Sequence, residues 1–335
     1  MKLFKMFSRK LIFPTVVSLG LEKYISKYSA NKCLILNYHG VVKNFDLALS
    51  KNHMPAEQFK KHLSYFKREF NVISLSDIFH LYQNDITPDR NTIAITFDDG
   101  YENNFTNALP ILQAFGFPAT IFVTAEILLN PNEALWYDQI DILKTKESFS
   151  SFKNYLKESY PQITNIESFS SLKEHFKDLN ADKKKFLLDI INSRKEYKES
   201  IYSCNKEYWK MMSAEQIKII SSETNVEIGS HSVSHSNLDR LNEDMLRDEL
   251  KSSKEILERC ISKNIDSIAF PDGAYNEKAK EISIESGYTK LLAVKYHLDS
   301  DKKDFSILPR LSISNTTTFE STMITIHRSF NTLGF

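Results

Sequence analysis

Short apolar runs alternate with amphipathic stretches along most of the chain. Runs rich in β-branched and aromatic residues cover 32–41, 72–75, 91–100, 118–124, 226–230, 267–270, 291–294 and 307–313. Each run ends in polar, glycine or proline residues, which is typical of a buried strand. Helical periodicity lies between several of these runs, at 55–70, 105–115 and 242–257. We therefore predict about eight strands with helices between most of them, which favours an α/β fold of mainly parallel strands closed into a barrel or near-barrel.

The alternation of strands and helices is interrupted between about 127 and 223. This stretch is rich in Lys, Glu, Ser and Asn and has helical patches but few β-branched runs. Because it follows a strand, we expect a helical insertion at the edge of the sheet where parallel α/β folds bind ligands. The aromatic residues at its two ends either pack the insertion onto the barrel or stack on sugar rings. They are Trp136, Tyr137, Tyr208 and Trp209.

Residues 1–31 are expected to form a separate N-terminal segment, followed by the barrel at 32–335. Four basic residues within 2–10 precede an apolar run at 11–21. That order resembles a secretory signal, but no small-residue cleavage site follows, and a bilayer span needs about 20 apolar residues. We expect an amphipathic segment that packs on the barrel or rests on a membrane surface, with an uncleaved anchor or export signal as the alternative. A cytoplasmic or membrane-peripheral location is thus favoured over export.

Charge and cysteine content exclude several classes of partner and of site. The 43 Lys and Arg residues balance 43 Asp and Glu residues, so no overall field attracts nucleic acid, and an uncharged partner such as a sugar is favoured. The three cysteines Cys33, Cys204 and Cys260 have no metal-binding spacing. Their odd number argues against a disulfide framework.

Two strand ends carry residues suited to chemistry. Asp98 and Asp99 follow a buried strand, and Gly100 lets the chain turn, so one carboxylate can hold a metal while the other moves a proton. A plain Asp-Asp-Gly turn is the alternative. His231 and His235 follow another strand among small serines and aim two imidazoles at one point. Zinc favours such nitrogen donors together with a carboxylate oxygen.

Three motifs, taken in order, carry a family resemblance. Thr-Phe-Asp-Asp-Gly at 96–100, His-Ser-Val-Ser-His at 231–235 and Phe-Pro-Asp-Gly-Ala-Tyr at 270–275 resemble those of the NodB-type polysaccharide deacetylases, the fourth carbohydrate esterase family. The resemblance covers nearly the whole chain outside its ends and the insertion. It implies a distorted (β/α) barrel, a divalent metal held by Asp99, His231 and His235, and Asp98 as the catalytic base. Zinc is the expected ion, and cobalt, nickel and manganese are the alternatives.

The leaving nitrogen of an amide also needs a proton donor. One branch of the family, similar to the deacetylases of exopolysaccharide systems, places the catalytic histidine before the Asp-Asp motif. Asn-Tyr-His-Gly-Val at 37–41 looks like that branch and makes His39 the expected general acid. His327 is the alternative, His297 a weaker one, and a buried structural histidine is the non-functional interpretation of His39.

The chain departs from the family pattern at the third motif. The arginine that often precedes Pro-x-Gly is missing, and we hypothesise that Arg310 orients Asp98 in its place. Asp272 stands where a tyrosine is usual. The turn of Asp272, Gly273 and Tyr275 is expected to supply a backbone N–H to an oxyanion and to border the substrate.

The resemblance implies a hydrolase that removes N-acetyl groups from the amino sugars of a polysaccharide or glycolipid precursor. Its partner would be an N-acetylated glycan and not a nucleic acid. Two alternatives remain beside it. The same residues can remove a formyl or O-acetyl group, and a non-catalytic carbohydrate-binding protein can retain the same barrel.

Overall fold

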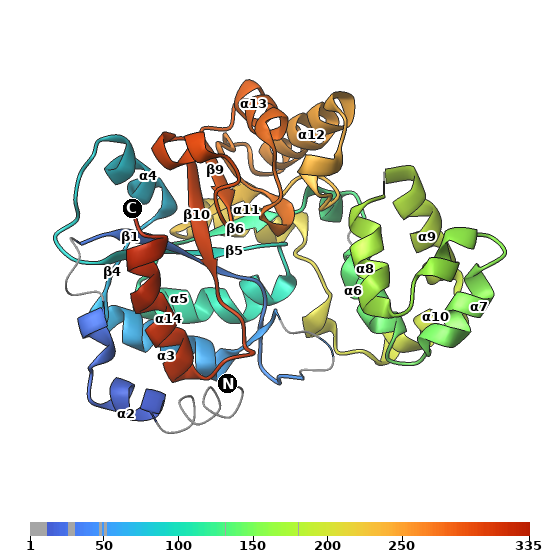
Figure 1. Cartoon of the computed structure of the whole chain (residues 1–335), viewed down its shortest axis with the longest axis horizontal. Coiled ribbons are helices and arrows are strands. Elements are labelled where there is room, and N and C mark those ends of the chain that lie inside the picture. Colours follow the sequence, from blue (N-terminus) through green and yellow to red (C-terminus); the bar gives the residue numbers. More distant parts are fainter. Residues whose placement is uncertain (1–11, 26–30, 47–48, 50–51, 131, 180) are drawn as a thin grey trace.

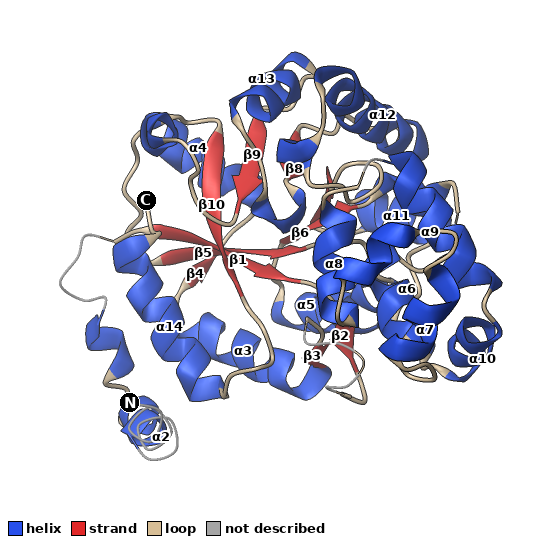
Figure 2. Ribbon diagram, turned by 45° about the vertical axis from the view of Figure 1, so that its right-hand side comes forward, coloured by secondary structure: helices blue, strands red, loops and turns tan. Residues whose placement is uncertain are grey.

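The strands form a closed parallel barrel, as the alternation predicts. The computed structural model describes residues 12–25, 31–46, 49, 52–130, 132–179 and 181–335. Seven parallel strands surround the barrel axis, and the pairing of β1 with β5 closes the ring (Figure 2). In spatial order they are β1 (Cys33–Tyr38), β10 (Ile307–Ser312), β9 (Lys290–Ala293), β8 (Ser267–Ala269), β7 (Val226–Ser230), β6 (Ala119–Val123) and β5 (Thr92–Phe97).

Helices cover the outside of the barrel (Figure 2). The main core lies between them and the strands. Gly116, with a φ of 70°, ends the helix at 109–115 as predicted, because glycine tolerates the left-handed conformation of a helix terminus. The covering helices are α3 (Ala56–Glu69), α4 (Leu75–Gln83), α5 (Leu109–Phe115, preceded by a π-helical turn at Asn104–Ala108), α11 (Ala214–Glu223), α12 (Glu243–Ile261), α13 (Glu277–Glu285) and α14 (Phe319–Thr332).

The strand expected at 72–75 is wrong beyond its first residue. The strand in this region, β4, covers only Asn71–Val72, which pair with β5. The Ser74 side chain then accepts a hydrogen bond from the Asp77 N–H and begins α4, so Leu75 is helical. A serine cap satisfies an N–H group that a helix start leaves without a partner, and here it outweighs the apolar pattern.

The barrel interior has an apolar layer beneath a polar layer. Ile35, Ala94 and Leu308 form the apolar layer, which lies toward the amino-terminal end of the strands. Two positions further along their strands stand Asn37, Thr96 and Arg310, all at most 2% exposed. Because alternate residues of a strand share a face, these polar side chains also point inward, at the carboxyl end of the barrel.

The interruption after β6 is helical and has its own hydrophobic core (Figure 1). That core extends from Ala134 to Trp209, and Ile127, Ile217 and Ile220 belong to the main core instead. The helical lobe is therefore narrower than the expected 127–223. Its helices are α6 (Trp136–Leu143), α7 (Phe149–Leu156), α8 (Phe169–Lys177), α9 (Ala181–Ser193) and α10 (Lys195–Ser203).

The N-terminal segment is described only in part, because residues 1–11 and 26–30 lie outside the described residues. Helix α2 (Phe13–Ser18) and a 3-10 turn (Glu22–Ile25) pack against α14. Glu22 is buried and accepts a hydrogen bond from the Tyr65 hydroxyl at 2.7 Å. Among the described helices, none has the length and apolar character needed to cross a membrane.

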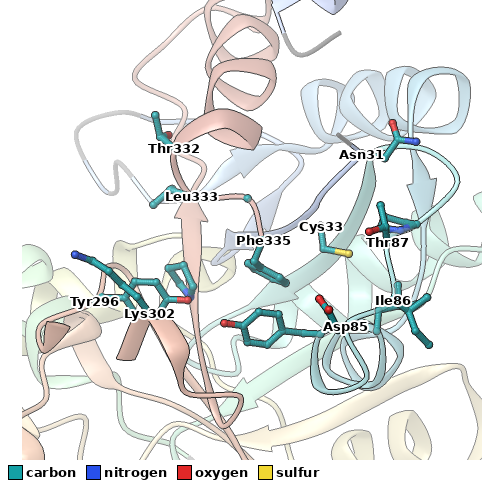
Figure 3. A pocket seen from close by; sticks show the side chains of 15 residues that line it. Asn31, Cys33, Asp85, Ile86, Thr87, Tyr296, Lys302, Thr332, Leu333 and Phe335 are labelled. Atoms are coloured by element: carbon teal, nitrogen blue, oxygen red, sulfur yellow. The ribbon is translucent and has the colours of Figure 1, made fainter. Parts of the chain in front are cut away.

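A cavity of about 370 Å³ lies at the amino-terminal end of the barrel strands (Figure 3). Cys33 at the start of β1 and Phe335 after α14 line it, and the Cys33 N–H donates to the Phe335 carbonyl at 2.9 Å. The predicted site residues lie at the opposite end of the barrel. All three cysteines are free, and burial raises the pKa of Cys33 to about 12, as expected of an unreactive thiol.

Candidate metal centre and catalytic site

Neighbouring strand ends bring the predicted residues together. Tyr38 at the end of β1 pairs with Phe97 at the end of β5, so His39 and Asp98 leave the sheet side by side. His231 follows the end of β7, and Asp272 follows β8 by three residues. Because all these strands run parallel, their carboxyl ends meet at one mouth of the barrel.

Asp99, His231 and His235 form a compact set of donor atoms. One ligand atom from each lies within 4.8 Å of the others. Asp99 Oδ1 is 3.4 Å from His235 Nε2 and 3.6 Å from His231 Nε2. All three side chains are buried.

These donors fit a divalent ion. The Nδ1 atom of His231 lies 2.7 Å from the Ala269 carbonyl oxygen, which fixes the proton on Nδ1 and leaves the Nε2 lone pair toward Asp99. Asp99 Oδ1 is buried and, among the described residues, accepts no hydrogen bond. A buried carboxylate oxygen without a donor is unfavourable unless a cation contacts it. Two imidazole nitrogens and one carboxylate oxygen are a donor set that zinc favours.

The loops that carry these donors and the turn at Asp272 contain strained residues. Asp99, Ser232, His235 and Asp272 all have positive φ values, between 51° and 78°. Residues other than glycine rarely adopt this conformation, and each costs about 1–3 kcal/mol. Such strain persists only where the surrounding contacts hold it.

Asp98 precedes Asp99 in the same loop and is paired with Arg310. The guanidinium donates to both carboxylate oxygens, at 2.7 and 2.8 Å, and Asn37 Nδ2 donates to Oδ2 at 2.8 Å. Arg310 also lies over the Phe122 ring, 5.4 Å from its centroid. Burial alone raises the pKa of Asp98, but the charge and the hydrogen bonds of Arg310 favour the ionised form, and the pKa lies below its usual value. Asp98 is therefore ionised and fixed in orientation.

His39 lines a cavity of about 170 Å³ together with two of the three donors, Asp99 and His235. Its buried Nδ1 atom has no hydrogen-bond partner within the described part of the chain. Trp136 and Tyr137 of α6 and Lys177 of α8 also line it. The cavity is lined by His39, Asn52, Asp99, Trp136, Tyr137, Lys173, Glu174, Lys177, His235 and Asp272.

The insertion contacts all three motif loops. The Tyr101 hydroxyl donates to Asp138 of α6 at 2.8 Å. Trp136 Nε1 lies 3.4 Å from the His235 carbonyl oxygen, and Lys177 forms an ion pair with Asp272 at 3.1 Å. The insertion is therefore part of the site and not an appendage.

The aromatic residues at the ends of the insertion serve mainly in packing. The Trp136 ring is stacked on Phe176 with centroids 5.4 Å apart, and the Tyr137 ring lies 5.0 Å from that of His235. The Tyr208 hydroxyl donates to the Asn44 carbonyl at 2.8 Å. Trp209 belongs to the insertion core. Of the two interpretations, the contacts favour packing, although Trp136 and Tyr137 also border the cavity.

Other predicted residues are placed elsewhere or are already engaged. The Gly273 N–H donates to the Phe270 carbonyl at 2.8 Å, which leaves the Asp272 N–H as the candidate oxyanion donor of this turn. Tyr275 is buried, and its hydroxyl donates to Asp301 at 2.5 Å. His327 lies on α14, and its Nε2 is 2.8 Å from the hydroxyl of Tyr65 on α3. His297 is exposed and follows β9.

Sequence reasoning missed three groups near the site. His53 is fully buried, and its ring lies between those of Tyr101 and Tyr208. Burial lowers the pKa of His53 to about 3, which keeps it neutral. Asp138 is buried, and burial, with only partial relief from Tyr101, raises its pKa. Glu249 contacts the histidine loop from α12. Of these three, only Asp138 carries a local sequence signal, because it directly follows Trp136 and Tyr137.

Comparison with known proteins agrees with the motifs. A family model described as polysaccharide deacetylase matches residues 85–146 and 178–291, which is just over half of the chain. The poly-beta-1,6-N-acetyl-D-glucosamine N-deacetylase of Staphylococcus aureus is 26% identical over 181 residues, covering 50% of this chain and 60% of that protein. The matched regions span 32% to 60% of the length of the curated relatives.

Two solved structures share the fold. The deacetylase PplD of Streptococcus pyogenes, solved with acetate, matches with a TM-score of 0.59 at 16% identity over 88% of this chain and 98% of that one. IcaB from Ammonifex degensii matches with a TM-score of 0.57 at 13% identity over 90% and 98%. With the family model and the closed barrel, these likenesses show that the chain belongs to the NodB-type polysaccharide deacetylase family.

Proposed function

We propose that the chain is a metal-dependent hydrolase that removes N-acetyl groups from the amino sugars of a glycan. The main support is the meeting of three buried donor atoms, an oriented carboxylate and a cavity-lining histidine at one mouth of the barrel. The name of the staphylococcal relative supports a polymer of N-acetylglucosamine as the substrate class.

Asp99, His231 and His235 would hold the ion, and zinc suits that donor set best. When bound, such an ion lowers the pKa of a coordinated water and polarises the acyl carbonyl. Asp98 is ionised and can take the proton of the attacking water. Arg310 and Asn37 keep its carboxylate in one orientation.

Amide cleavage also needs a proton on the departing nitrogen, and His39 is the group we assign to it. It lines the cavity on the side of β1, beside the Asp-Asp loop. The Asp272 N–H would donate to the oxyanion that forms on the acyl carbon. Trp136 and Tyr137 border the cavity and would exclude water beside the sugar.

The direct test is acetate release from an N-acetylglucosamine oligomer by protein loaded with zinc. Activity should disappear with a chelator and return when zinc is added. The same assay with formylated and O-acetylated substrates ranks the alternative hydrolase reactions. Binding of the oligomer without any acetate release under all metal conditions would favour the non-catalytic alternative.

His39→Ala is expected to lower amide cleavage about 100-fold or more, since general acid–base catalysis contributes about 10²–10⁴-fold. Cleavage of 4-nitrophenyl acetate should fall much less, because its leaving group departs without a proton. Initial rates on both substrates measure the ratio. His80→Ala, an exposed histidine on α4, is the matched control. Equal losses on the amide and the ester would contradict the assignment.

We also propose that the N-terminal segment contacts a membrane surface. Leu19, Leu21 and Tyr24 are 65%, 46% and 45% exposed, and basic residues precede them in the sequence. Such a combination suits an anionic interface. The full chain should sediment with vesicles containing 30% phosphatidylglycerol, a composition we choose so that the surface is anionic. Leu19→Ser with Leu21→Ser should release it, and equal sedimentation of the two proteins would exclude this contact.

A further inference from the structure

The loop that carries both histidines is wrapped around one carboxylate. Glu249 lies on α12, and its Oε2 accepts the Val233 N–H at 2.8 Å and the Ser234 N–H at 3.0 Å. The Ser234 hydroxyl donates to Oε1 at 2.5 Å. Hydrogen bonds to an ionised acceptor are stronger than neutral ones, so Glu249 holds this loop firmly.

The bonds to Glu249 fall at the strained part of the loop. Ser232 and His235 have φ values of 64° and 51°, and the two N–H groups held by Glu249 belong to the residues between them. Those residues also separate His231 from His235. If the two N–H groups were released, the loop could relax to ordinary φ values, and the two imidazoles would turn away from a common point.

A second contact reaches the same loop from the insertion. Lys184 of α9 is 4% exposed, and its Nζ donates to the Ser236 hydroxyl at 3.0 Å. Ser236 in turn lies 2.8 Å from the Ser234 hydroxyl, which donates to Glu249. The Lys184 ammonium also lies over the Trp136 ring, 5.4 Å from its centroid. The loop is thus held between a barrel helix and the insertion.

Neither Glu249 nor Lys184 lines the cavity that contains His39 and Asp99. Neither belongs to the set of donor atoms that meets at the metal centre. Their contacts with the histidine loop run through Val233, Ser234 and Ser236. An effect on the centre would therefore act through the position of the two imidazoles.

We propose that Glu249 is a positioning residue that sets the geometry of His231 and His235, and that Lys184 links the insertion to the same loop. The affinity of the centre for its ion then depends on two side chains that contact neither the ion nor the substrate. This inference rests on the proposed function, because it assumes that the two histidines bind a metal.

The test is the zinc affinity of the full chain, measured by competition with a chromogenic chelator, together with the visible spectrum of the cobalt-loaded protein. Glu249→Ala should weaken zinc binding at least about tenfold and change the cobalt bands, as loss of a partner that orients metal ligands does. Glu249→Gln keeps one oxygen for the two N–H groups and should stay within about threefold of wild type. The zinc affinity of Lys184→Met should lie between those of these two variants.

Glu255→Ala, an exposed glutamate on the same helix, is the matched control. Ser234→Ala is the second variant. It removes the hydroxyl that contacts Glu249 and Ser236, and it leaves the hydrogen bonds from the Val233 and Ser234 N–H groups to Glu249 in place. This variant should weaken zinc binding about threefold, which is less than the loss expected for Glu249→Ala. If Glu249→Ala has the zinc affinity and cobalt spectrum of the wild type, the inference is wrong and the proposed function stands. If Glu249→Ala does not fold, the same result for Ser234→Ala leads to the same conclusion. A wild-type chain that binds neither ion would overturn the inference and the proposed function together.

Discussion

Asp98→Asn should reduce deacetylation about 10²–10⁴-fold while zinc affinity stays within about threefold of wild type. An amide accepts a proton far more weakly than a carboxylate does, and Asp98 is not among the three donors of the metal centre. The asparagine can still accept one hydrogen bond from Arg310, so the barrel mouth should keep its shape. Turnover of an N-acetylglucosamine oligomer and bound zinc, measured on the same preparation, separate the two effects.

The control for this substitution is Asp248→Asn, at an exposed position of α12. Its turnover and zinc content should match those of the wild type. Activity of Asp98→Asn within tenfold of wild type would mean that another group takes the proton. Loss of zinc in parallel with activity would mean that Asp98 supports the metal centre instead.

Arg310→Ala should destabilise the protein by about 3–5 kcal/mol at neutral pH, because it leaves the Asp98 carboxylate buried without its cation. Arg310 is 1% exposed and donates twice to Asp98, so water cannot easily replace it. Deacetylation should also fall, because the base loses its fixed orientation and its pKa rises. Urea denaturation and turnover at a temperature where the variant is folded measure both effects.

The destabilisation by Arg310→Ala should depend on pH. Arg310 lowers the pKa of Asp98 in the folded protein. Their pairing therefore stabilises the fold at pH values above the pKa of Asp98 in the unfolded chain, which is about 4. This stabilisation is lost as the pH falls through the pKa of Asp98 in the folded protein. In the variant, burial raises the same pKa, so acid relieves the buried charge. The gap between the two proteins should therefore shrink from pH 7 toward pH 4. A constant gap would show that the loss comes from packing alone.

Asp98→Asn is also the partner for a double-substitution cycle with Arg310→Ala. If the two side chains act as a pair, the double variant should be more stable than the sum of the single losses predicts. Arg310→Ala should leave zinc affinity nearly unchanged in either background, since the hydrogen bonds of the guanidinium go to Thr96 and Asp98. This last result separates a role in orienting Asp98 from a role in the metal centre.

The sequence by itself predicted alternating strands and helices of a barrel or near-barrel, the helical interruption, the Asp-Asp loop and the histidine pair. These features are local. The periodicity of a strand or helix can be read from neighbouring residues. A motif of five residues likewise contains the side chains that its chemistry needs. The closed barrel confirms the predicted fold class, and the family model confirms the predicted family.

Only the tertiary structure decided which side chains surround the motifs. Arg310 and Asp98 are separated by 212 positions, Lys184 and Ser236 by 52, and Tyr101 and Asp138 by 37. Their contacts depend on strand register and on the placement of the insertion, for which no short pattern of residues codes. Burial of His53 and the hydrogen bonds that engage Gly273 and Tyr275 arise in the same way, because each neighbour comes from a distant part of the fold or from a turn whose geometry the packing sets.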